Sequence, residues 1–80
     1  MIRISNSTRR KPAEILELAA KFFGPDGLGL KETERGDCCI SFGGADGYVS
    51  VRLVEESNRR AVDVESREYE YHAKQFLKRL

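Results

Sequence analysis

The stretch CCISFGGADGYVSVRLV, residues 38–54, decides the fold. Its two halves alternate apolar and polar residues, and the glycine-rich segment Gly43–Gly47 separates them. Alternation with a period of two is typical of a strand that buries one face, and glycine tolerates the positive φ angles of tight hairpin turns. The stretch therefore predicts two antiparallel strands, residues 37–43 and 48–54, joined by a hairpin loop.

The same alternation extends to the flanking segments and divides the side chains between two faces. Residues 60–65 form a further predicted strand, and residues 28–35 form a weaker one, in which Leu28 and Leu30 share a face with Glu32 and Glu34. The predicted buried face carries Cys38, Ile40, Phe42, Val49, Val51, Val62 and Val64. The predicted outward face carries Cys39, Ser41, Tyr48, Ser50, Arg52, Ala61 and Asp63.

Two amphipathic helices flank these strands. A helix should begin near Pro12, because proline suits the first helical position, and end before Gly24. Its apolar stripe is Ile15, Leu16, Ala19, Phe22 and Phe23. A second helix is expected behind Ser66 as N-cap, with the stripe Tyr69, Ala73, Phe76, Leu77 and Leu80. Ile2 and Ile4 alternate with polar residues, which indicates a short N-terminal strand over residues 1–5.

These elements predict one α+β domain over residues 1–80. Its antiparallel meander sheet has four strands, or five with the N-terminal strand, and two helices pack on one face, in the order (β)-α-β-β-β-β-α. This order resembles the half-repeat of the TATA-binding protein and, more loosely, a shortened helix-grip domain. The resemblance covers the element order and no motif, so it implies a fold and no function.

Composition limits the function classes. The 80 residues include 14 Lys and Arg against 13 Asp and Glu, a net charge of +1, so no global field attracts polyanions. No apolar run is long enough for a signal peptide or a membrane span, which favours a cytoplasmic protein. Cys38 and Cys39 are adjacent, and neighbouring side chains of a strand point to opposite faces, so we expect two reduced thiols there.

No set of residues in the sequence has the spacing of a catalytic or metal site. Cys38 and Cys39 are adjacent, whereas zinc and thioredoxin-like motifs separate their cysteines by two or more residues. His72 has a possible acid–base partner one helical turn away, Glu68, but the sequence shows no nucleophile or substrate-binding residue to complete a catalytic set. We therefore expect no enzyme activity, no cofactor and no metal. A small-ligand or thiol and metal site at the cysteines or His72 stays as an alternative.

The leading hypothesis is a protein-interaction module that uses the uncovered sheet face. That face is polar but short-chained, and its candidate binding residues are Ser41, Tyr48, Ser50 and Arg52. The partner would be an unknown protein or a second copy of the chain. The alternative is a nucleic-acid-binding domain that uses the basic residues Arg9, Arg10, Lys11, Arg59 and Arg60.

Overall fold

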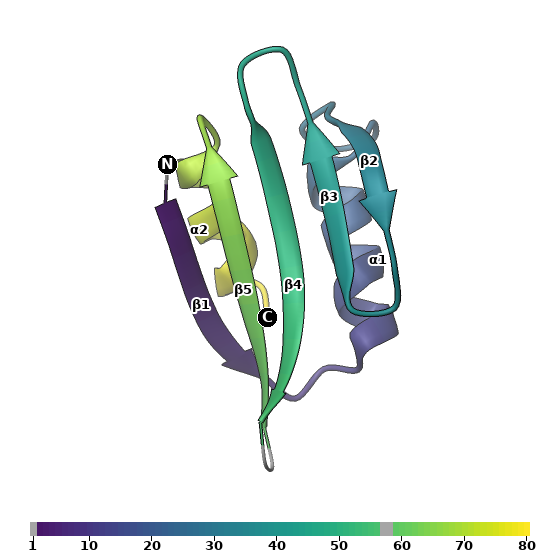
Figure 1. Ribbon diagram of the computed structural model, residues 1–80, viewed down its shortest axis with the longest axis vertical. Coiled ribbons are helices and arrows are strands. Elements are labelled where there is room, and N and C mark those ends of the chain that lie inside the picture. Colours follow the sequence, from purple (N-terminus) through teal and green to yellow (C-terminus); the bar gives the residue numbers. More distant parts are fainter. Residues whose placement is uncertain (1, 57–58) are drawn as a thin grey trace.

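Two helices cover one face of a single open, antiparallel five-stranded sheet (Figure 1). The structure is a computed structural model that describes residues 2–56 and 59–80. The elements are β1 (Ile2–Thr8), α1 (Pro12–Phe23), β2 (Lys31–Arg35), β3 (Cys39–Gly43), β4 (Tyr48–Glu56), β5 (Arg59–Arg67) and α2 (Glu70–Lys78). The predicted α+β class and element order are confirmed.

The sheet order is β1-β5-β4-β3-β2, so β2 to β5 form the predicted meander. The N-terminal segment is indeed a strand, and it runs antiparallel to β5, with Ile2 opposite Ser66 and Thr8 opposite Arg60. Ile4 of β1 packs against the core. The first and last strands of the chain are therefore neighbours, and β1 forms one edge of the sheet while β2 forms the other.

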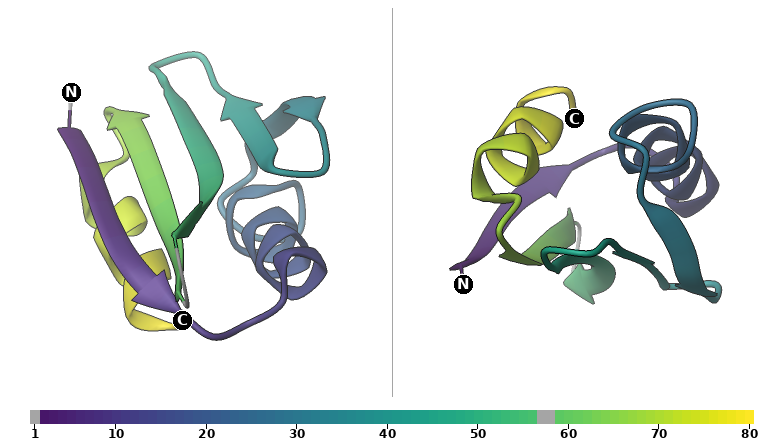
Figure 2. Two further views of the ribbon diagram at one scale, coloured as in Figure 1. Left: turned by 60° about the horizontal axis from the view of Figure 1, so that its bottom comes forward. Right: turned by 90° about the horizontal axis from the view of Figure 1, so that it is seen from above.

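The core lies between the sheet and the helices. Ile40, Phe42, Val49, Val51, Val62 and Val64 are buried, as predicted. The aromatic ring of Phe23 in α1 lies 5.6 Å from that of Phe42 and 5.2 Å from that of Phe76 in α2, measured between centroids. One aromatic cluster thus joins both helices to the sheet. Figure 2 shows both helices on the same side, which leaves the opposite sheet face uncovered.

Strand β2 is shorter than predicted, and its side chains are distributed differently between the two faces of the sheet. It begins at Lys31, and a register shift between Glu32 and Glu34 interrupts its pairing with β3. Such a bulge adds a residue and reverses the alternation, so Glu32 lies opposite Phe42 whereas Glu34 lies opposite Ser41. The expectation that the two glutamates share a face is therefore wrong. Glu32 accepts a 2.8 Å hydrogen bond from Arg35, which lowers the pKa of the Glu32 carboxyl.

Helix α2 begins later than the sequence predicts. Ser66 is not its N-cap, because β5 continues to Arg67 and the chain turns at Glu68, which has a φ of 72°. Ser66 is fully buried, and its Oγ has no hydrogen-bond partner in the described part of the protein. Neither helix of the described chain is long and apolar enough to cross a membrane.

Candidate functional site: the open face of the sheet

The uncovered side of the sheet, here called the open face, is organised in rows that cross the strands. Strand pairing aligns one row from β1 to β2, consisting of Arg3, Glu65, Ser50, Ser41 and Glu34. A second row contains Ser5, Asp63, Arg52 and Cys39. Side chains at directly opposed positions lie close enough to interact. The rows therefore combine hydroxyl groups with charges of both signs.

The predicted binding residues Ser41, Tyr48, Ser50 and Arg52 all belong to β3 and β4. The hydroxyl oxygens of Ser41 and Ser50 lie 2.8 Å apart, at hydrogen-bonding distance. The Tyr48 hydroxyl donates a 2.7 Å hydrogen bond to Glu65 of β5. This bond to a carboxylate favours the protonated phenol and raises the pKa of Tyr48. Short-chained groups and a tethered tyrosine thus give the centre of the open face a fixed shape.

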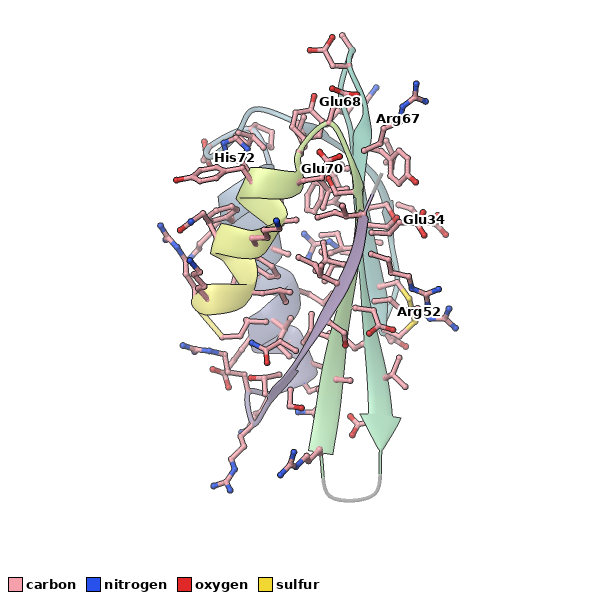
Figure 3. All side chains as sticks on the ribbon, turned by 90° about the vertical axis from the view of Figure 1, so that its left-hand side faces the viewer. Glu34, Arg52, Arg67, Glu68, Glu70 and His72 are labelled. Atoms are coloured by element: carbon pink, nitrogen blue, oxygen red, sulfur yellow. A yellow bond between two sulfur atoms is a disulfide. The ribbon has the colours of Figure 1, made fainter. Side chains whose placement is uncertain are left out.

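A shallow hollow of about 430 Å³ lies on the open face. Its lining includes Arg3 and Asp63, whose charged groups are 3.8 Å apart, and also Glu34, Ser41, Ser50, Arg52 and Glu65. Figure 3 shows Glu34 and Arg52 projecting from the side of the sheet opposite the helices. No hydrogen bond or ion pair engages either of them among the described residues. The hollow therefore carries one unengaged cation and one unengaged anion.

Cys38 and Cys39 border the same hollow and form a disulfide. Two expectations are corrected here: the thiols are not reduced, and Cys38 is exposed rather than part of the core. Cys38 is exposed because β3 begins only at Cys39, so the alternation of a regular strand does not apply to Cys38. Cys39 is half-buried on the open face, as predicted.

At the alternative site, the described structure gives His72 a ring contact but no hydrogen bond to the expected partner. The His72 ring contacts Tyr71, with 5.4 Å between ring centroids, and no hydrogen bond joins it to Glu68 in the described part of the chain. Glu68 lies in the turn before α2, and both residues are labelled in Figure 3. No group of three or more His, Cys, Asp or Glu side chains is placed to hold a metal within residues 2–56 and 59–80.

The basic residues of the nucleic-acid hypothesis lie away from the hollow, where β1 ends and β5 begins. Arg60 donates a hydrogen bond to the carbonyl oxygen of Arg10. The sequence could not tell whether the segment of Arg9, Arg10 and Lys11 meets that of Arg59 and Arg60, and the structure brings the two together.

Sequence reasoning missed Glu34 and Arg3 as members of the open face. Arg3 alternates with Ile2 and Ile4, so its position followed from the predicted N-terminal strand. The position of Glu34 depends on the bulge in β2, for which the sequence offers no glycine or other local signal.

The comparisons with known proteins supply no relative for this site. No protein-family model, curated protein or solved structure matches the chain.

Proposed function

We propose that this chain is a non-enzymatic protein-interaction module that binds its partner through the open face. The observation that carries the proposal is the pair of unengaged opposite charges, Arg52 and Glu34, in a hollow whose other polar groups are held by bonds within the sheet. Arginine and tyrosine are enriched among the residues that dominate protein–protein binding energy. Groups that are already fixed lose little entropy on binding.

Mixed charge supports a protein partner over a nucleic acid at this face. Asp63, Glu65 and Glu34 would repel a phosphate backbone, whereas a protein surface can offer a carboxylate to Arg52 and a cation to Glu34. The serines have short side chains, so a partner backbone can approach the sheet closely. The partner expected from this chemistry is therefore a polar protein surface with both charges.

A second copy of the chain is the first partner to test. Under twofold symmetry one patch meets itself, so Arg52 of each copy can face Glu34 of the other. Sedimentation equilibrium should detect a dimer, Arg52→Glu should dissociate it, and adding Glu34→Arg in the same chain should restore it. A monomer at every concentration, together with no protein crosslinked to the open face, would contradict the proposal.

The cytoplasmic location expected from the sequence belongs to the same proposal. Disulfides are rare in the cytosol except where they are transient or redox-active. The redox state of Cys38 and Cys39 inside the cell is therefore an independent test of the location. Trapping thiols with maleimide in intact source cells should find Cys38 and Cys39 reduced if the protein is cytoplasmic. A fully oxidised pair would argue for an oxidising compartment.

A further inference from the structure

Three segments that are far apart in the sequence meet at one end of the molecule. Thr8 at the end of β1 lies opposite Arg60 of β5, and Arg60 donates a hydrogen bond to the carbonyl of Arg10. Arg10 in turn donates a 3.4 Å hydrogen bond to the carbonyl of Arg79, behind α2. Asn6 also donates a 3.5 Å hydrogen bond to the carbonyl of Leu77. Figure 1 shows the tip of β1 beside the start of β5 at this end.

The meeting point gathers basic residues from all three segments, and we call it the basic end. Its members are Arg9, Arg10, Lys11, Arg59, Arg60, Lys78 and Arg79. The carboxylates paired with them among the described side chains are Glu14, which lies 3.7 Å from Arg10, and Glu55, which lies 2.7 Å from Arg60. Seven cations are thus paired with two described carboxylates. A local positive surface exists although the net charge of the chain is only +1.

The members of the basic end fall into two groups. Arg10 and Arg60 are held by bonds within the protein, and Arg79 stacks 5.0 Å from the centroid of the Phe22 ring. Arg9, Lys11 and Arg59, by contrast, are exposed, and no hydrogen bond or ion pair engages their side chains among the described residues. Lys78 is exposed in the same way between Leu77 and Arg79, whose carbonyls the β1 segment contacts. These four cations are available to a ligand.

Among the described residues, the large apolar side chains at the basic end are buried or half-buried, as Phe22 is beneath Arg79, and none is exposed for insertion into a bilayer. Tyr71 is the large apolar residue most exposed in the described chain, at 69%, and it lies in the first turn of α2, at the opposite end of that helix. Membrane-binding surfaces combine basic residues with inserted apolar or aromatic ones. A hydrophilic polyanion fits the basic end better than a lipid surface does.

We propose that the basic end binds the phosphate backbone of a nucleic acid without sequence preference, through Arg9, Lys11, Arg59 and Lys78. Salt bridges to phosphates release counterions, so affinity supplied in this way falls steeply with salt. Within the described part of the chain no exposed aromatic ring lies at the basic end to stack on bases, which removes the usual source of single-strand base preference. Arg10 and Arg60 act as positioning residues, because they hold the three segments together.

Fluorescence anisotropy with labelled single-stranded RNA, single-stranded DNA and duplex DNA tests this proposal. Four phosphate contacts predict that log K falls against log salt with a slope of about −2.8 for single strands and about −3.6 for duplex. The double variant Arg9→Ala with Lys11→Ala should lower the single-strand slope by about 1.4. The matched control, Lys31→Ala with Arg67→Ala, removes two exposed cations at the other end of the sheet, in the row of Gly43 and Tyr48, and should bind as the wild type does.

Thermal melts of both double variants should match the wild type, because none of the four side chains takes part in a bond within the described residues. Three results would overturn the proposal: no anisotropy change at low salt, equal weakening in the Lys31 and Arg67 control, or binding to phosphatidylserine vesicles without binding to any nucleic acid. The open face plays no part here, so Arg52→Glu should leave nucleic-acid binding unchanged.

Discussion

Tyr48 of β4 and Glu65 of β5 are joined by a 2.7 Å hydrogen bond in which the phenol donates to the carboxylate. The bond joins two neighbouring strands across the open face, and its acceptor Glu65 belongs to the row that contains Ser50 and Ser41. It fixes the single aromatic ring of the predicted binding residues in one orientation. The shape of the open face therefore depends on this pair.

The Tyr48–Glu65 bond predicts a pH dependence. The pKa of Tyr48 is raised by the bond to Glu65, so the stabilisation is complete below the ordinary tyrosine pKa of about 10. It is lost as the pH rises through the raised value. An ultraviolet titration of the wild type, with Tyr48→Phe as the difference control that isolates the Tyr48 signal, should show Tyr48 ionising above its ordinary pKa, and Glu65→Gln should bring that pKa back toward about 10. A Tyr48 pKa at or below the ordinary value in the wild type would contradict the bond.

The buried hydroxyl of Ser66 predicts a neutral or stabilising substitution. Its Oγ has no hydrogen-bond partner in the described structure. Ser66→Ala therefore removes an unsatisfied polar atom without breaking a hydrogen bond. Urea unfolding should give a free energy of unfolding equal to that of the wild type or up to about 1 kcal/mol higher. A loss of more than 1 kcal/mol would mean that the hydroxyl has a partner.

Gly47 predicts a destabilising substitution with a matched control. A Cβ at Gly47 would collide with the carbonyl oxygen of Arg67, whereas a Cβ at Gly36 would meet nothing within 4 Å. Gly47→Ala should therefore lower the free energy of unfolding by about 1–3 kcal/mol, as overpacking does. Gly36→Ala should leave it unchanged or raise it by about 0.5 kcal/mol. Equal effects in the two variants would refute the close approach of the Gly47 backbone to the Arg67 carbonyl.

The Cys38–Cys39 disulfide predicts a redox-dependent labelling pattern. The folded protein, purified without reductant, should take up no maleimide, because both sulfurs are bonded to each other. After treatment with a dithiol reductant it should take up two labels, which intact-mass spectrometry counts. Uptake of two labels by the untreated protein would show that the thiols are free.

The sequence was sufficient for most of the sheet. In β3 and β4 apolar residues alternate with polar ones, and a glycine-rich turn separates the strands. This pattern was enough to predict that Ser41, Ser50 and Arg52 lie on the face of the sheet away from the core. The burial of Ile40, Phe42 and Val49 followed from the same pattern. A one-residue slip would have exposed these apolar side chains, which is why the register was predictable.

Other features depend on tertiary structure and had no local signal. The bulge in β2 sends Glu34 to the open face, and the pairing of β1 with β5 joins Arg10 to Arg60, fifty residues away. Ser66 looked like an N-cap because serine commonly takes that role, but pairing with Ile2 and Val49 on both sides keeps it in β5. In each case, pairing with a neighbouring strand determines where the residue lies, and the local sequence does not.

Site-specific photo-crosslinking tests the proposed role of the open face most directly. A benzophenone side chain placed at Ser50, beside the hollow, should crosslink a protein partner in extracts of the source cells, and Arg52→Glu in the same chain should reduce the yield at least tenfold. The same group at Lys21, on the exposed side of α1, should give no adduct. Adducts from Lys21 with none from Ser50 would contradict the proposal that the open face binds the partner.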